Sequence, residues 1–78
     1  MFSGDVEAVL TKVGLKDHEA KVYLTLLQDK EFGLNVAAIT KKTKFKRSTI
    51  NLILDRLIDR GFISFHIEYY YLIFRTYR

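Results

Sequence analysis

Five cationic side chains fall within seven consecutive residues near the middle of the chain: Lys41, Lys42, Lys44, Lys46 and Arg47. Ammonium and guanidinium groups this close together bind phosphate groups, and a helix that begins directly after them adds its N-terminal N–H groups to the same anion. An isolated basic run is more often a solvated surface. The elements around this run therefore decide between the two interpretations.

The residues after the basic run have the clearest helical pattern in the chain. Apolar residues recur at three- and four-residue spacing before a glycine: Ile50, Ile53, Leu54, Leu57 and Ile58, then Gly61. This spacing predicts a helix with one apolar stripe. A shorter helical pattern precedes the run, with Asn35 as its N-cap and Ile39 and Thr43 facing inward. Residues 35–61 therefore predict a helix-turn-helix, with Phe45 as an apolar plug in the turn.

Further helices and a hairpin are expected around this motif. Residues 5–13 and 15–29 carry helical apolar spacing, and Phe32 is expected to pack beneath the loop that follows. After the second helix of the motif, aromatic and β-branched residues without Pro or Gly indicate strands at residues 62–67 and 69–75. The only polar break, at residues 66–68, is the expected turn. The predicted fold is mainly α with a small β-hairpin: one winged helix-turn-helix domain over residues 1–78, with three to four helices and a C-terminal wing.

Charge is divided unevenly along the chain. Residues 1–40 contain four Lys and six Asp or Glu, a balance of −2, whereas residues 41–78 contain nine Lys or Arg and three Asp or Glu, a balance of +6. This asymmetry indicates a polyanionic partner bound by one face. The sequence has no cysteine, no secretory signal pattern and no apolar run of membrane-spanning length. We therefore expect a cytoplasmic protein without membrane contact.

Two stretches resemble the TrmB-like winged-helix regulators, a family of archaeal and bacterial transcription factors. Residues 14–24, GLKDHEAKVYL, are similar to the opening motif of the family. The runs KRSTI at 46–50, LDRL at 54–57 and RG at 60–61 resemble its recognition helix and the exit from it. The resemblance covers about residues 6–65 and implies a DNA-binding domain. Family members commonly continue into a dimerisation helix and an effector-binding domain. This sequence ends before either, so we expect no small-molecule effector.

Three departures from the family pattern carry structural expectations. Lys16 stands where the family usually has a capping Ser or Thr, so we expect no capping box with Glu19 and a cap at Asp17. Lys44 stands where the family favours a turn glycine, which predicts either a strained backbone or a changed turn. Asn51 replaces a frequent tyrosine and offers an amide that can hydrogen-bond adenine.

If the domain binds duplex DNA, helix 47–60 should enter the major groove with its N-terminus first. The residues expected to contact base edges are Arg47, Ser48, Asn51 and Leu52. Those expected to contact phosphates are Lys42, Lys44, Lys46, Thr49 and Arg56. A good base contact is worth about 1–3 kcal/mol of discrimination. The alternative for Leu52 is that a single exposed leucine needs no functional explanation.

The C-terminal strand is apolar on both faces. Strict alternation places Tyr69, Tyr71, Ile73 and Tyr77 on one face, opposite Tyr70, Leu72 and Phe74. We predict a homodimer that buries the Tyr69 face and spaces two recognition helices roughly one turn of DNA, ~34 Å, apart. One alternative is that the core covers the hairpin on both sides. Another is a protein-interaction module that uses this tyrosine-rich hairpin and has no DNA partner.

Catalytic and metal-binding patterns are missing from the sequence. His18 and His66 stand apart from other ligands at metal-binding spacing, and surface histidines are the simpler interpretation. The sequence contains no Gly-rich phosphate loop and no nucleophile motif. We therefore expect a non-enzymatic protein that needs neither a cofactor nor a metal.

Overall fold

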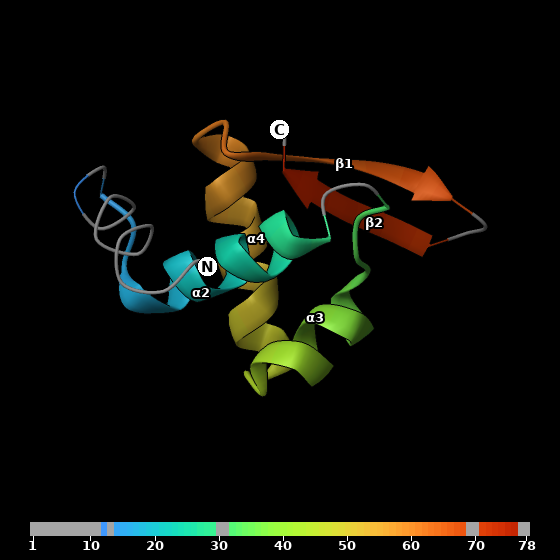
Figure 1. The fold of residues 1–78 in the computed structure, drawn as a ribbon, viewed down its shortest axis with the longest axis horizontal. Coiled ribbons are helices and arrows are strands. Elements are labelled where there is room, and N and C mark those ends of the chain that lie inside the picture. The colour runs from blue at the N-terminus through green and yellow to red at the C-terminus, as the bar shows by residue number, and fades with distance from the viewer. Residues whose placement is uncertain (1–11, 13, 30–31, 69–70, 77–78) are drawn as a thin grey trace.

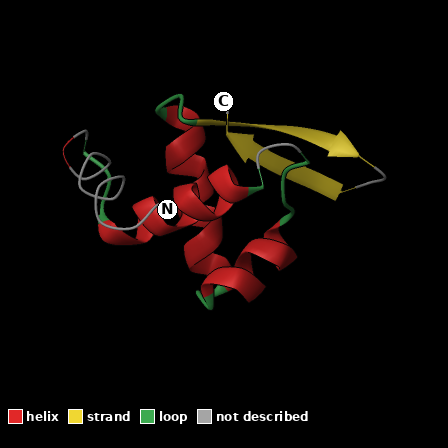
Figure 2. Ribbon diagram, viewed as in Figure 1, coloured by secondary structure: helices red, strands yellow, loops and turns green. Residues whose placement is uncertain are grey.

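The computed structural model describes residues 12, 14–29, 32–68 and 71–76, so the helix predicted at residues 5–13 lies outside the described residues. Three helices are followed by an antiparallel hairpin (Figure 1, Figure 2): α2 (Asp17–Gln28), α3 (Val36–Thr43), α4 (Arg47–Asp59), β1 (Ile63–Glu68) and β2 (Tyr71–Thr76). This is a winged helix-turn-helix, as predicted, with the hairpin as the wing.

The core is formed by apolar side chains, most of them aliphatic, from the helices and from both strands. Eight of the larger ones are almost completely buried: Leu15, Val22, Leu26, Ile39, Ile50, Leu54, Leu57 and Ile63. The apolar stripe of α4 faces inward as its spacing predicts. In α2, the helical spacing predicts Ala20, Tyr23, Leu24 and Leu27 on the inner face. The observed stripe is rotated from this, because Val22 and Leu26 are fully buried and Tyr23 is only half-buried. Tyr23 instead packs edge-on against Phe62, with ring centroids 5.7 Å apart.

The predicted hairpin turn at residues 66–68 is wrong. His66, Ile67 and Glu68 belong to β1 and pair with Ile73, Leu72 and Tyr71 of β2. Side chains alternate between the two faces of a strand, so a polar residue at every second position is compatible with an uninterrupted strand. The polar side chains of His66 and Glu68 therefore mark one face of β1 rather than a break in it.

The segment between α2 and α3 contacts the wing. Leu34 and Phe74 form an antiparallel bridge, so β2 lies between Leu34 and β1. Gly33 has φ +80°, and a Cβ there would lie 2.6 Å from Ile73 Cγ2, so the close approach requires glycine. The expected packing of Phe32 beneath the loop is wrong: this side chain is 77% exposed. Leu34, two residues later, packs against the core instead.

Candidate nucleic-acid interface

The N-terminus of α4 lies open at the end of the helix-turn-helix. Lys46 is the N-cap residue and its side chain makes no capping hydrogen bond, and the first turn contains no acidic residue. The first N–H groups of a helix lack intrahelical acceptors and carry the positive end of the helix dipole. Exposed Lys46 and Arg47 add two positive charges at the same point. The start of α4 can therefore bind an anion such as a phosphate group.

The turn before α4 is held by an unusual backbone conformation. Lys44 has φ 67° and ψ 14°, a left-handed conformation, so the strained backbone is the one of the two expected alternatives that occurs. Its N–H donates to Thr40 O at 2.8 Å and ends α3. The buried Thr43 hydroxyl donates to Ile39 O and accepts the Phe45 N–H at 3.3 Å. This network fixes the direction in which the basic side chains leave the turn.

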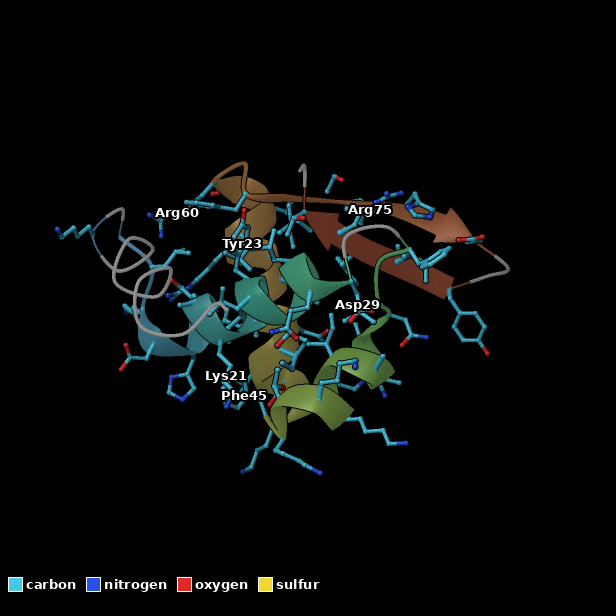
Figure 3. All side chains as sticks on the ribbon, viewed as in Figure 1. Lys21, Tyr23, Asp29, Phe45, Arg60 and Arg75 are labelled. Carbon is cyan, nitrogen blue, oxygen red and sulfur yellow. The ribbon has the colours of Figure 1, made fainter. Side chains whose placement is uncertain are left out.

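Phe45 joins the turn to α2. Its half-buried side chain packs against the hydrophobic core, which confirms the predicted plug between the two helices. Phe45, labelled in Figure 3, also contacts His18 at the start of α2, with ring centroids 5.0 Å apart. Phe45 therefore contacts both the core and α2, and these two contacts fix the angle between α3 and α4.

All nine side chains predicted to contact DNA reach the surface. The base-contacting set is exposed within the first two turns of α4: Arg47, Ser48, Asn51 and Leu52. In the phosphate-contacting set, Lys42, Lys44, Lys46 and Arg56 are exposed and Thr49 is half-buried. Lys42 Nζ lies 3.9 Å from Asp29 Oδ2, and both side chains are well exposed, so this ion pair is weak. Arg56 is the member of the set with a strong intramolecular partner.

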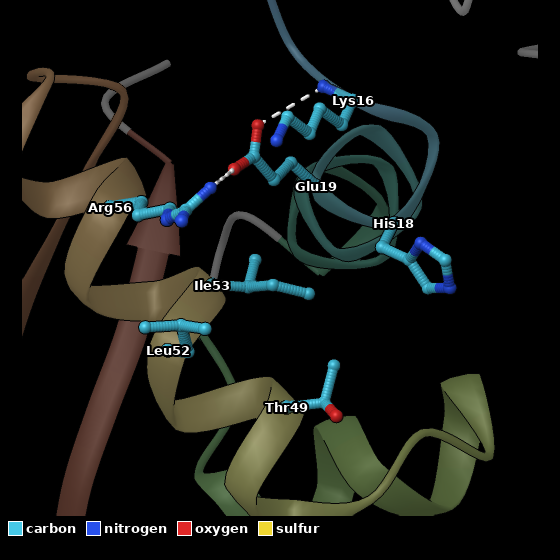
Figure 4. A pocket seen from close by; sticks show the side chains of 7 residues that line it. All are labelled: Lys16, His18, Glu19, Thr49, Leu52, Ile53 and Arg56. Carbon is cyan, nitrogen blue, oxygen red and sulfur yellow. Dashed lines mark hydrogen bonds and ion pairs between the residues drawn. The ribbon is translucent and has the colours of Figure 1, made fainter.

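A buried carboxylate, Glu19, holds Arg56, and the sequence analysis gave it no such role. Glu19 is 4% exposed, and its Oε2 accepts from Arg56 Nη1 at 3.3 Å (Figure 4). Arg60 Nη1 lies 3.9 Å from Glu19 Oε1 and donates to Gly14 O at 3.1 Å. Arg56 of α4 and its C-cap residue Arg60 are thus tied to the start of α2 and to the residues just before it. The resemblance of residues 14–24 was a signal that this segment matters, but no spacing rule connects residue 19 with residue 56.

Glu19 also corrects the expected cap of α2. Lys16 is the N-cap residue, so the expected cap at Asp17 is wrong, because Asp17 is already the first helical residue. Glu19 Oε1 accepts the Lys16 N–H at 3.0 Å, so the glutamate half of a capping box forms although the lysine side chain has no acceptor. Burial alone would raise the pKa of Glu19, but the Lys16 N–H and the charges of Arg56 and Arg60 bring the net pKa below its usual value of 4.5.

A cavity of about 340 Å³ lies between the start of α2 and α4 (Figure 4). It is lined by Lys16, His18, Glu19, Thr49, Leu52, Ile53 and Arg56. Three of these residues, Thr49, Leu52 and Arg56, belong to the predicted DNA-contacting set. The exposed Lys16 and His18, which the sequence analysis left without a role, lie beside them.

A family model, described as the sugar-specific transcriptional regulator TrmB, matches residues 10–77. The chain belongs to the TrmB family. The match includes α2, the helix-turn-helix and the wing. No curated protein and no solved structure matches the chain. TrmB-family membership makes the protein a transcription regulator with a DNA-binding helix-turn-helix domain.

The wing of this TrmB-family domain divides its apolar residues between two faces. Tyr71 is exposed and Ile73 half-buried on the face predicted to dimerise, whereas Tyr69 and Tyr77 lie outside the described residues. The face that packs on the helices also reaches solvent, at Phe65, Ile67 and Leu72. Exposed apolar surface is therefore present on both faces of the hairpin.

Two features are absent from the described residues. No helix there is long and apolar enough to cross a membrane. In the same part of the chain, no group of three His, Cys, Asp or Glu side chains is placed to hold a metal ion.

Proposed function

We propose that this TrmB-family chain is a sequence-specific regulator that reads the major groove of double-stranded DNA with α4. It acts in the cytoplasm as a homodimer, without catalysis, cofactor or small-molecule effector. The observation that carries the proposal is the open N-terminus of α4, which has no capping side chain and no acidic residue in its first turn and is flanked by exposed Lys44, Lys46 and Arg47.

Each proposed contact follows from the chemistry of the side chain. Arg47 can fork to the two acceptors of a guanine, Asn51 can bind adenine, and Leu52 can touch a thymine methyl group. Ser48 completes the set at base edges. Lys42, Lys44, Lys46 and Thr49 bind phosphates, which position the protein without reading sequence. Arg56 binds phosphate in competition with Glu19, 3.3 Å away, so we expect its contribution to be the smallest.

The test is the affinity for random-sequence duplex DNA at increasing salt, measured by fluorescence anisotropy. At about 0.9 per neutralised phosphate, the four cationic phosphate contacts predict a slope of roughly −3 to −4 for log K against log salt. Lys46→Glu/Arg47→Glu should abolish binding. Single Lys46→Glu should weaken it strongly, while Lys12→Glu, the same charge change at an exposed residue before α2, should change it little. Equal losses from Lys12→Glu and Lys46→Glu would mean that only net charge matters.

A second candidate function is a protein-interaction module that uses the wing. It is favoured by the exposed apolar side chains there, with Phe65, Ile67 and Tyr71 each more than half exposed. The charge-reversal variant separates the two candidates. Regulation through DNA contact should fail in Lys46→Glu/Arg47→Glu, whereas partner binding through the hairpin should survive.

A further inference from the structure

The outer edge of β1 has open backbone groups. Leu34 N–H donates to Phe74 O at 2.9 Å and Phe74 N–H donates to Leu34 O at 2.7 Å, so both backbone groups of Phe74 point away from β1. Phe65, which is paired with Phe74, therefore forms a non-hydrogen-bonded pair with it. By alternation, the N–H and C=O groups of Ile63, Phe65 and Ile67 point outward. No strand in the described ranges pairs with this edge.

Phe65 and Ile67 also carry apolar surface that the helices leave uncovered. Directly opposed residues share a face of an antiparallel sheet, so these two side chains lie on the same face as Phe74 and Leu72. Phe74 is 6% exposed against the helices, whereas Phe65, Leu72 and Ile67 are 51%, 45% and 72% exposed. Figure 1 shows the hairpin extending beyond the helices. The inner face of the wing thus continues past the core without cover.

We infer that a second copy of this chain pairs antiparallel along β1, about a two-fold axis at His66. The inference rests on the homodimer of the proposed function and names its interface. It does not depend on the DNA contacts, because the pairing forms without DNA.

β1 is complementary to itself in this register. Phe65 lies opposite Ile67 of the second copy on the inner face, an aromatic and β-branched pair of the kind that stabilises sheets. The outward N–H and C=O groups of Phe65 can also form hydrogen bonds with the outward C=O and N–H groups of Ile67 of the second copy. On the other face, the Ser64 hydroxyl faces the Glu68 carboxylate of the second copy and can donate to it. The strand contains no Lys, Arg or Pro, the residues that commonly block sheet edges. A foreign strand would need to match this pattern by chance, whereas a second copy matches it by symmetry.

The first test is the oligomeric state of the 78-residue chain, measured by sedimentation velocity over a range of concentrations. Wild type should be a dimer at high micromolar concentration. Ile67→Pro removes an outward N–H and apolar contact but no hydrogen bond of the hairpin, and proline is tolerated on edge strands. This variant should be monomeric with an unchanged circular dichroism spectrum. Tyr71→Lys, at an exposed residue on the opposite face, should remain dimeric.

The register has its own test, because the chain contains no cysteine. The two copies of residue 66 face each other in a non-hydrogen-bonded pair, where Cβ atoms are about 4.5–5.5 Å apart. His66→Cys should therefore form a disulfide-linked dimer on mild oxidation. Glu68→Cys should do so only when mixed with Ser64→Cys.

Three results would overturn the inference: a monomeric wild type, a dimer abolished by Tyr71→Lys but not by Ile67→Pro, or a dimer in which His66→Cys does not crosslink. Fluorescence anisotropy with DNA distinguishes a failure of the β1 pairing from a failure of the proposed DNA binding. A monomer whose DNA affinity still depends on Lys46 would exclude the homodimer and its pairing along β1 but not the proposed DNA contacts of α4.

Discussion

The start of α4 and the outer edge of β1 are two exposed surfaces of opposite chemistry on one small core. The first presents charged and polar side chains on a backbone whose turn is fixed by Lys44 and Phe45. The second presents apolar side chains and backbone groups that pair with no strand in the described part of the chain. The first suits a polyanion, and the second suits another strand.

This difference predicts opposite responses to salt. Phosphate contacts release counterions, so binding through α4 should weaken steeply as salt increases. Burial of apolar surface and backbone pairing do not depend on counterion release, so association through β1 should persist. High salt should therefore separate the two activities in one sample.

The largest effect is expected from a substitution that creates a cavity in the core, because the core supports both surfaces. Leu54 is 1% exposed, and Leu54→Ala should cost about 2–5 kcal/mol of unfolding free energy. Thermal unfolding should show one transition at a lower temperature, whether followed by helical circular dichroism or by tyrosine fluorescence. Two separate transitions would mean that the wing and the helices unfold independently.

The next effect separates base contacts from phosphate contacts within the DNA-binding surface. Arg47→Ala should cost about 1–3 kcal/mol on a selected operator and relax base preference. Lys42→Ala should weaken binding to all sequences alike and make the salt slope shallower by about one. Binding selection and salt titration on both variants measure these effects. Uniform weakening in both variants would assign Arg47 to a phosphate.

Glu19 links α2 to α4 through Arg56, and its contribution to stability depends on pH. Its folded-state pKa is lowered, so its stabilising effect is present above the ordinary value of 4.5 and is lost as pH falls through the folded-state pKa. Glu19→Gln should cost about 1–3 kcal/mol at neutral pH and flatten this acid dependence. Denaturant unfolding across pH measures both. If the variant loses as much stability at low pH as the wild type, other carboxylates cause that loss.

The smallest effect is expected at the turn. Lys44→Gly should stabilise the fold by up to about 1 kcal/mol, because glycine adopts positive φ without strain. The same variant should lose one phosphate contact and make the salt slope shallower by about one. Lys42→Gly, within the last turn of α3, should instead destabilise the protein by about 1 kcal/mol. Equal effects at the two positions would contradict a special role for the Lys44 backbone.

Much of the fold could be predicted because helical spacing alone fixes which side of α4 is buried. The left-handed Lys44 was one of two alternatives, since the family favours glycine at that position and a lysine there implies either a strained backbone or a changed turn. The hairpin turn was not predictable, because polar residues on one face of a strand resemble a break when only the sequence is read. The link between Glu19 and Arg56 joins residues 37 positions apart, and no local pattern reports such a contact.

The same helical geometry correctly placed Arg47, Ser48, Asn51 and Leu52 on the exposed side of α4, while their contacts with DNA stay a prediction. The open edge of β1 was not predictable from the sequence, because it depends on which side of β2 Leu34 occupies. Only the bridge between Leu34 and Phe74 reveals which backbone groups of β1 remain unpaired.

The Leu34–Phe74 bridge also has a consequence for the order of folding. It closes a loop of 40 residues (74 − 34), at an entropic cost of about 3 kcal/mol. The contacts between α3 and α4 span far shorter loops, so we expect these helices to associate first and β2 to dock last. β1 would then present an ordered edge only in chains that have already formed the helical core. Because β2 docks last, incompletely folded chains would lack the ordered β1 edge through which two copies pair.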